Sequence, residues 1–123
     1  MKEIVAIIRP NKIGATKDAL EALGFASFTA EAVTGRGKQR GIAGEVHYDF
    51  KPERLLSMAR SAGMKYVPKR RLTIVVSDAE VDTVVKSIIE VNQTGQVGDG
   101  KIFVCSLEEA IRVRTDEKGD TAL

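Results

Sequence analysis

TGQVGDGKIFV, residues Thr94 to Val104, joins a glycine-rich loop to an apolar strand. Within it, Gly98, Asp99 and Gly100 are followed at once by Lys101. Glycine lets the backbone approach a ligand closely and adopt a positive φ. Successive backbone N–H groups beside a lysine form a concavity that fits an anion. The stretch therefore predicts an anion-binding loop that enters a strand, although a plain connecting loop fits GDGK equally well when those four residues are taken alone.

Two further basic segments lie far from this loop in the sequence. One is GRGKQRG, residues Gly35 to Gly41, and the other is Arg112-Val113-Arg114. In an extended strand Arg112 and Arg114 project to the same side, about 7 Å apart. This spacing suits a polyphosphate, because arginine binds phosphate oxygens in a bidentate manner; a charged edge strand is the alternative. One anionic ligand contacted by all three segments explains the layout better than three unrelated loops.

Other polar residues carry weaker signals. Alternation sends Lys69 and Arg71 to one side of a strand and Arg70 to the other, and a solvated edge is the favoured interpretation. Gln39 could offer its amide oxygen to a hard metal ion, but by itself it is an ordinary loop residue. Cys105 follows an apolar run and is expected to be a packed small hydrophobe.

The 123 residues predict one domain whose core needs no disulfide. No apolar run reaches the roughly 20 residues of a membrane span. One cysteine excludes an intramolecular disulfide, which is typical of a reducing, cytoplasmic setting.

The net charge of +2 conceals an asymmetry, because residues 36–71 hold ten Lys or Arg and three acids, whereas the remainder holds nine basic and fourteen acidic residues. The basic middle favours anions or an acidic partner surface.

Hydrophobic periodicity predicts five strands, two helices and one long loop. Ser77 and Glu80 form a capping box at the start of the second helix, and Gly24 is expected to cap the end of the first. The order strand, helix, strand, loop, strand, helix, strand is the pattern of the α+β ferredoxin-like fold (βαββαβ), with helices on one face of the sheet. The strands span Glu3–Arg9, Phe25–Thr34, Arg71–Val76, Lys101–Cys105 and Ala110–Arg114, the helices span Lys12–Leu23 and residues 77–92, and the loop spans about residues 35–67.

The apolar residues of these elements predict both a core and an assembly. The helix residues expected to face the sheet are Ile13, Thr16, Leu20 and Leu23, and then Val81, Val84, Val85, Ile88 and Ile89. The strand residues Ile4, Ala6, Ile8, Ile74, Val76, Ile102 and Val104 are too apolar for the other face of the sheet to remain in water. An exposed apolar face implies self-association, so we expect an oligomer with ligand sites at subunit boundaries. The polar tail, residues 115–123, is expected to be mobile.

No catalytic constellation is visible in the sequence. The single histidine, His47, lies in the long loop and is expected to be solvated. No pair of carboxylates has a suggestive helical spacing, and no second cysteine is available for a metal knuckle. An enzyme is therefore not expected. An RNA-binding sheet would need paired aromatic residues, but the equivalent strands offer only Phe103. An acylphosphatase-like enzyme would need a pair of arginine and asparagine that the sequence lacks. Neither alternative is therefore favoured.

Taken together, these motifs resemble the PII family of nitrogen signal-transduction proteins over nearly the whole chain, residues 1–123. MKEIVAIIRPNKI resembles the family's first strand and helix start, GRGKQRG the base of its long T-loop, and VPKRRLTIVV the returning strand. TGQVGDGKIFV followed by IRVRT resembles its C-terminal signature. The resemblance implies a ferredoxin-like trimer that binds ATP or ADP in the clefts between subunits, and 2-oxoglutarate beside Mg-ATP.

The resemblance also implies roles for individual residues. The nucleotide would contact Thr29, Gly35, Gly37, Lys38, Val75, Gly98, Asp99, Gly100 and Lys101, with Arg112 and Arg114 reaching the phosphates from the neighbouring subunit. For 2-oxoglutarate the implied residues are Gln39, Arg40, Gly41, Lys69 and Gly98. Gln39 would also coordinate Mg²⁺, together with the ATP phosphates and 2-oxoglutarate.

Part of the sequence resembles one branch of the family in particular. GRGKQRGIAGE, the insert LLSMARSAGMKY and VNQTG are similar to nitrogenase-regulating members, which work as a pair of related proteins and inhibit dinitrogenase by binding it. A homotrimer or an assembly with a sister subunit is therefore expected, without nucleic acid or membrane insertion. The alternative is a regulator of an ammonium transporter or another nitrogen-assimilation protein. The chain departs from the family in lacking the tyrosine uridylylation motif and in having Thr73 where many relatives have glutamate.

Overall fold

The structure, a computed structural model, describes residues 1–37 and 66–123. Much of the predicted T-loop lies outside these residues, including Lys38, Gln39, Arg40, Gly41 and His47 and the insert that follows them. The described elements are β1 (Lys2–Ile8), η1 (Pro10–Lys12), α1 (Ile13–Ala22), β2 (Thr29–Gly35), β3 (Val67–Val76), η2 (Asp78–Glu80), α3 (Val81–Asn92), β4 (Lys101–Ser106) and η3 (Gly119–Ala122).

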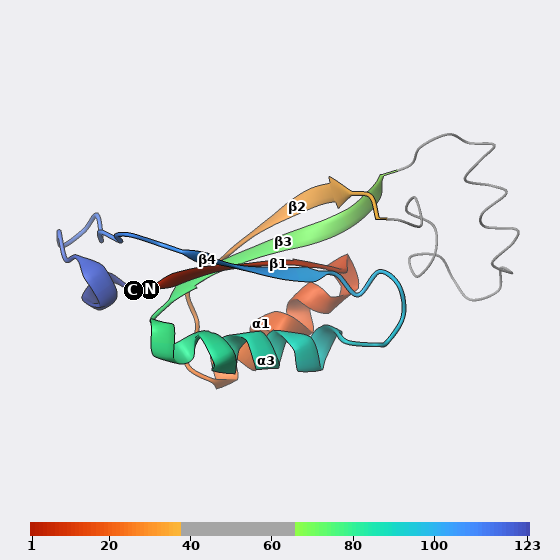
Figure 1. Cartoon of the computed structure of the whole chain (residues 1–123), viewed down its shortest axis with the longest axis horizontal. Coiled ribbons are helices and arrows are strands. Elements are labelled where there is room, and N and C mark those ends of the chain that lie inside the picture. Colours follow the sequence, from red (N-terminus) through yellow and green to blue (C-terminus); the bar gives the residue numbers. More distant parts are fainter. Residues whose placement is uncertain (38–65) are drawn as a thin grey trace, which may run out of the picture.

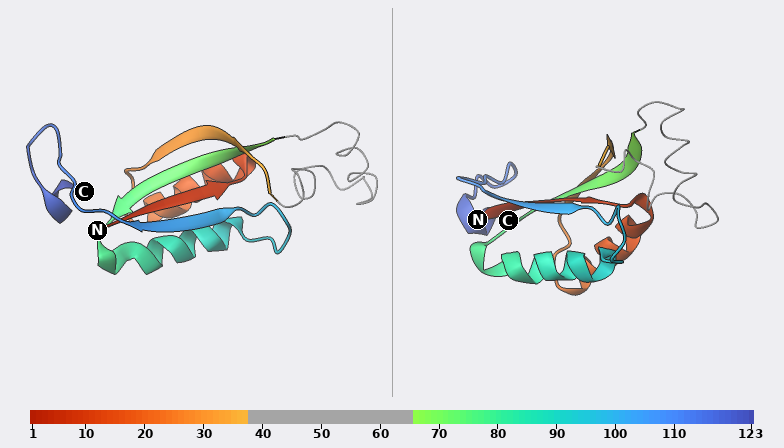
Figure 2. Two further views of the ribbon diagram at one scale, coloured as in Figure 1. Left: turned by 45° about the horizontal axis from the view of Figure 1, so that its top comes forward. Right: turned by 45° about the vertical axis from the view of Figure 1, so that its right-hand side comes forward.

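The four strands form one antiparallel sheet in the order β2-β3-β1-β4. Figures 1 and 2 show α1 and α3 side by side on one face of this sheet, while the other face carries no helix of the described chain. The central strand β1 pairs Ile4 with Ile74 of β3 and with Val104 of β4. This arrangement confirms the predicted α+β ferredoxin-like fold.

The core lies between the sheet and the two helices. Period-two alternation places Ile4, Ala6 and Ile8 of β1 on the helix side, where they pack with Leu20 of α1 and Val84 of α3, among other buried residues. The apolar residues of β1 and β3 therefore form the core, and Ile102 and Val104 of β4 lie on the same side of the sheet, so the prediction that these residues cover the helix-free face was wrong. Alternation alone does not reveal which of two faces the helices cover.

Local signals set the helix ends as predicted. Glu80 reaches back to Ser77, whose backbone N–H and hydroxyl lie 3.1 Å and 2.8 Å from the Glu80 carboxylate, so the capping-box prediction is confirmed in this contact. Gly24 has a φ of +91° and follows the end of α1, as predicted. Leu23 was predicted to face the core, but it lies at the helix end and is 49% exposed.

A polar contact joins the two helices inside the core. The amide nitrogen of Asn92 donates to the Thr16 hydroxyl at 3.0 Å and to the Ile88 carbonyl at 2.9 Å. Thr16 in turn donates to the Lys12 carbonyl at 2.7 Å. Both Asn92 and Thr16 are buried, so these bonds satisfy the Asn92 amide nitrogen and the Thr16 hydroxyl, which would otherwise be costly to bury, while the Asn92 amide oxygen has no partner among the described residues.

Three strand predictions need correction. β2 begins at Thr29 rather than at Phe25, and β3 begins at Val67 rather than at Arg71. The β2–β3 ladder explains the latter, because it runs without a break from Thr29↔Thr73 to Gly35↔Val67. Residues 110–114 do not form a fifth strand, since this region contributes only the isolated bridge Ile111↔Lys118.

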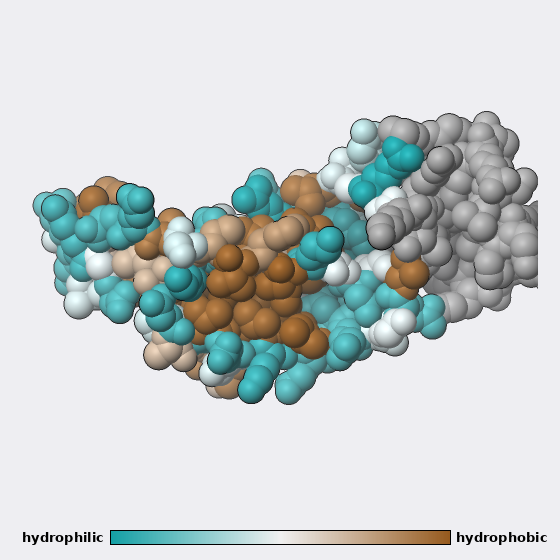
Figure 3. Space-filling view, viewed as in Figure 1, coloured by the Kyte–Doolittle hydropathy of each residue, from teal (hydrophilic) through white to brown (hydrophobic). Residues whose placement is uncertain are grey.

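The outer edge of β4 is more exposed than its sequence suggests. Cys105 was predicted to be packed, yet it is exposed, because β4 is an edge strand and the face that carries Phe103 and Cys105 has no covering layer. On the opposite face, Ile102 and Val104 border a cleft of about 440 Å³ between β4 and α3. Figure 3 shows apolar side chains gathered on the surface between β4 and α3.

Candidate functional site

The glycine-rich loop between α3 and β4 is built around an arginine that follows β1. Arg9 is 8% exposed. Its guanidinium lies 2.6 Å from the Asp99 carboxylate and donates to the Val97 carbonyl at 2.9 Å. These two contacts fix the middle of the loop against the end of the central strand.

Asp99 gathers the first part of the same loop. Its carboxylate accepts the Thr94 hydroxyl at 2.5 Å and the backbone N–H groups of Thr94 and Gly95 at 2.8 Å and 3.0 Å. Burial acts to raise the pKa of Asp99, but the hydrogen bonds from the Thr94 hydroxyl, Arg9, Thr94 N–H and Gly95 N–H outweigh it and hold that pKa well below its usual range. Asp99 is thus ionised, and its carboxylate organises the loop from within.

The two glycines around Asp99 have backbone conformations that side chains resist. Gly98 and Gly100 have φ values of +99° and +108°. At Gly100 an added Cβ would lie 1.9 Å from the carbonyl oxygen of Ile7, so the loop packs directly on the backbone of β1. Here the close approach that the sequence predicted is made to the protein's own strand.

Lys69 connects the glycine loop to the stem of the predicted T-loop. It belongs to β3, is 9% exposed, and donates from Nζ to the Gly98 carbonyl at 2.8 Å. The prediction of a solvated edge was therefore wrong for Lys69. Arg71, two residues along, is exposed and pairs with Glu31 of β2 at 3.6 Å, although β3 is an inner strand of the sheet.

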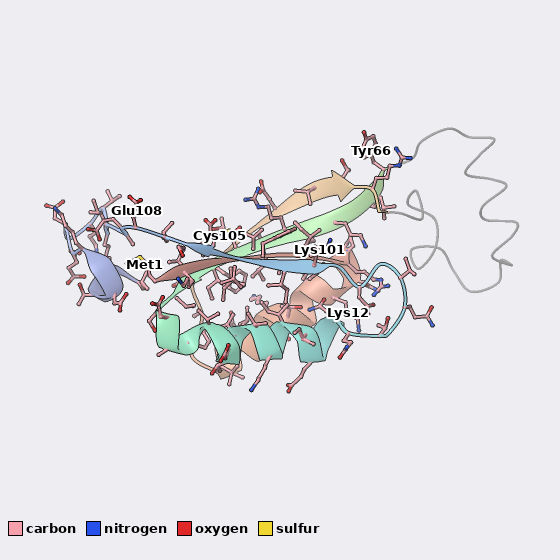
Figure 4. The ribbon with its side chains drawn as sticks, viewed as in Figure 1. Met1, Lys12, Tyr66, Lys101, Cys105 and Glu108 are labelled. Carbon is pink, nitrogen blue, oxygen red and sulfur yellow. The ribbon has the colours of Figure 1, made fainter. Side chains whose placement is uncertain are left out.

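One end of the sheet therefore gathers most of the predicted ligand residues. Gly35 ends β2 beside Val67, which begins β3. Lys69 follows in the same strand, and Gly98 to Lys101 lie against the end of β1. Figure 4 shows Lys101 at the start of β4, where the glycine loop meets the sheet. The glycine-rich backbone of the loop lies at this end together with Lys69 and Lys101, which is chemistry that suits a phosphate or carboxylate.

Thr29, Val75, Arg112 and Arg114, which were also predicted to contact the nucleotide, lie toward the other end of the molecule (Figure 1). β2 begins with Thr29, which pairs with Thr73, and Val75 lies further along β3. Figures 1 and 2 show the segment after β4, which carries Arg112 and Arg114, at the opposite end of the sheet from the glycine loop. The ten residues of β3 separate the two ends by about 30 Å. One chain therefore does not bring both groups together.

Arg112 has partners within its own chain. Its guanidinium pairs with Glu117 at 2.5 Å and donates to the carbonyls of Thr121 and Leu123 at 3.1 Å and 3.3 Å. Arg112 and Arg114 do not project from a strand as predicted, because a turn begins at Arg112, whose carbonyl accepts the Asp116 N–H at 2.9 Å.

The sequence interpretation missed Arg9 and Thr94 as components of this end of the sheet. Arg9 looked like the end of a strand, and its pairing with Asp99 spans 90 residues of sequence. Thr94 begins the stretch Thr94 to Val104, and its position five residues before Asp99 was the feature of the sequence that could have indicated their hydrogen bond. Within residues 1–37 and 66–123, no cluster of His, Cys, Asp and Glu could hold a metal ion, and no helix could cross a membrane.

Comparisons with known proteins agree along the whole chain. The model of the family described as Nitrogen regulatory protein P-II matches residues 1–117. The chain is 58% identical to the Nitrogen fixation nifHD1 region GlnB-like protein 2 of Methanosarcina barkeri, over 100% of this chain and 99% of that protein. It is 50% identical to the Nitrogen fixation nifHD region glnB-like protein 2 of Methanococcus maripaludis, over 100% of both.

A solved structure shows the same architecture. The crystal structure of Arabidopsis thaliana PII bound to citrate matches with a TM-score of 0.75 and 33% identity, over 99% of this chain and 91% of that chain. The fold, the family match over residues 1–117 and the identity to these relatives therefore agree. The chain belongs to the nitrogen regulatory protein P-II family, whose members are regulatory signalling proteins and not enzymes.

Proposed function

We propose that this chain is a cytoplasmic, trimeric sensor of ATP, ADP and 2-oxoglutarate that regulates nitrogenase by binding dinitrogenase directly. The names of the relatives, which refer to nitrogen fixation nifHD regions, support nitrogen fixation as its setting. The solved relative from Arabidopsis thaliana binds citrate, which is a small polycarboxylate. An end of the sheet rich in N–H groups and lysines suits such anions as well as phosphates.

The division of ligand residues between two ends supports assembly. A second copy placed head to tail would bring its Arg112 and Arg114 to the glycine loop of the first copy, and such a heterologous contact closes into a ring when the rotation permits. The apolar cleft between β4 and α3, with Val104 at its margin, and the unpaired edge of β4 supply surface for this contact. Each nucleotide would then be held by two subunits.

The observation that carries the signalling proposal is the bond from Lys69 Nζ to the Gly98 carbonyl at 2.8 Å. It joins the stem of the T-loop to the loop expected to hold phosphates. A carboxylate that recruits Lys69, or a phosphate that moves Gly98, changes this contact and with it the strand that returns from the T-loop. A ligand that binds two T-loop states unequally shifts their populations, and this transmits the signal.

The residues present fit the proposed ligands. Lys69 offers an ammonium with three donors to a carboxylate of 2-oxoglutarate, and Lys101 offers another to phosphates. Gln39, outside the described residues, has the hard amide oxygen that Mg²⁺ accepts. When bound, Mg²⁺ would neutralise phosphate charge and bring 2-oxoglutarate close to the nucleotide.

Calorimetry with ADP, Mg-ATP and 2-oxoglutarate tests ligand sensing. Gln39→Ala should abolish binding of 2-oxoglutarate in the presence of Mg-ATP and leave ADP binding largely intact. Lys69→Ala should weaken 2-oxoglutarate binding, because the variant lacks the ammonium that pairs with the ligand's carboxylate. Lys86→Ala is the matched control, since Lys86 lies exposed on α3 away from the glycine loop. Unchanged 2-oxoglutarate affinity in both variants would refute the proposed site.

Capture experiments test the target and the assembly. The wild-type protein should retain dinitrogenase with ADP bound and release it when 2-oxoglutarate and Mg-ATP are added. Sedimentation should give the mass of three chains, alone or together with a sister subunit. Retention of an ammonium transporter in place of dinitrogenase would replace the nitrogenase part of the proposal, and a monomer that ignores adenine nucleotides would refute the sensor itself.

A further inference from the structure

Residues 110–123 fold back on themselves around Arg112. The backbone N–H of Arg112 donates to the Glu117 carbonyl at 2.9 Å, and that of Gly119 donates to the Ala110 carbonyl at 3.0 Å. The turn between them contains Asp116 with a φ of +59°, a left-handed conformation that aspartate tolerates better than most residues. The segment predicted as a mobile tail therefore has defined local structure.

In this folded segment the guanidinium of Arg112 donates hydrogen bonds to one carboxylate and to two backbone carbonyls. Nη1 of Arg112 meets the Glu117 carboxylate, and Nη2 meets the carbonyls of Thr121 and Leu123. These are the same N–H groups that a phosphate would use in a bidentate contact. Arg114 makes no hydrogen bond or ion pair within the part of the chain that the structure describes. Only one of the two arginines is therefore occupied.

We propose that the C-terminal segment, residues 115–123, is an internal competitor for the phosphate site: Glu117 mimics the anion on Arg112 and must be displaced before Arg112 can bind a polyphosphate. The inference rests on the proposed nucleotide-binding function and adds regulation to the same site. Arg114 makes the first contact, and the polyphosphate then exchanges with Glu117 for Arg112. The segment thereby raises the nucleotide concentration at which the site fills.

The variant Glu117→Ala removes the carboxylate, and Glu108→Ala is its control. Both substitutions change the net charge equally, but Glu108 makes no hydrogen bond or ion pair within the described residues. Figure 4 labels it between the end of β4 and the folded segment. In calorimetry, Glu117→Ala should bind ATP about two- to fivefold more tightly than the wild type, the size expected for loss of a partly exposed ion pair. Glu108→Ala should bind like the wild type.

Amide hydrogen exchange without nucleotide tests the contact separately. In Glu117→Ala, the amides of Arg112 and Gly119 should exchange faster than in the wild type and in Glu108→Ala. Faster exchange with unchanged ATP affinity would overturn the competition, and so would equal exchange in all three proteins. If the wild type and every variant fail to bind ATP while exchange still differs, the proposed nucleotide site fails and this regulation fails with it.

Discussion

Alanine at Gly100 should destabilise the fold far more than alanine at Gly95, although both glycines belong to one loop and have positive φ values of +108° and +81°. At Gly95 an added Cβ meets nothing within 4 Å. The substitution there carries only the backbone strain of the conformation, about 1–2 kcal/mol.

At Gly100 a second effect is added to this strain. The new Cβ has to retreat from 1.9 Å to at least 3.0 Å from the Ile7 carbonyl oxygen, which is backbone and does not swing aside. Ile7 pairs with Lys101 in the β1–β4 ladder, so the movement breaks ladder hydrogen bonds at a cost of about 1–3 kcal/mol. We therefore expect a total loss of about 2–5 kcal/mol for Gly100→Ala.

Thermal unfolding measures the difference and is run at one fixed protein concentration, because the proposed assembly would make the midpoint concentration-dependent. At roughly 4 °C per kcal/mol for a domain of this size, Gly95→Ala should lower the midpoint by about 4–8 °C and Gly100→Ala by about 8–20 °C. Urea unfolding should give the same order. Equal midpoints for the two variants would refute the conclusion that the loop rests on the β1 backbone.

Two further predictions concern the Arg9–Asp99 pair. The folded state lowers the pKa of Asp99, so the ionised carboxylate stabilises the fold fully above its unfolded pKa of about 4, and this stabilisation is lost as the pH falls below that value. The difference in free energy of unfolding between the wild type and Asp99→Asn, measured with urea, should therefore become smaller from pH 7 to pH 3. A difference that stays constant would argue against the hydrogen-bond network around Asp99. Arg9→Ala should lower the free energy of unfolding by about 1–3 kcal/mol, because it leaves Asp99 and the Val97 carbonyl short of partners. Lys17→Ala, on the exposed side of α1, should change it little, and equal losses in the two variants would show that Arg9 has no special role.

Local chemistry in the sequence was sufficient for the elements themselves. The capping box of Ser77 and Glu80, the left-handed Gly24 and the period of the apolar residues located α1, α3 and the core strands to within a few residues. These signals act between near neighbours, so they can be interpreted without knowledge of the fold. The glycine pattern around Asp99 also predicted positive φ at Gly98 and Gly100, which the backbone has.

The sequence was less informative wherever a residue's partner lies far away along the chain. Lys69 looked like part of a solvated basic run, because Gly98 is 29 residues distant. Cys105 looked packed, because its apolar neighbours do not reveal that β4 is an edge strand. Predicted strand residues were assigned to the wrong face of the sheet for the same reason.

The amino-acid sequence by itself determined the order of strands and helices, the glycine loop and the resemblance to the P-II family. Only the tertiary structure decided that Arg9 holds Asp99, that Lys69 joins the T-loop stem to Gly98, and that Arg112 meets Glu117 at the opposite end of the sheet. The physical reason is that hydrophobic periodicity and capping depend on residues within one or two turns, whereas hydrogen bonds between distant side chains depend on strand order and register, which the whole folded chain sets together.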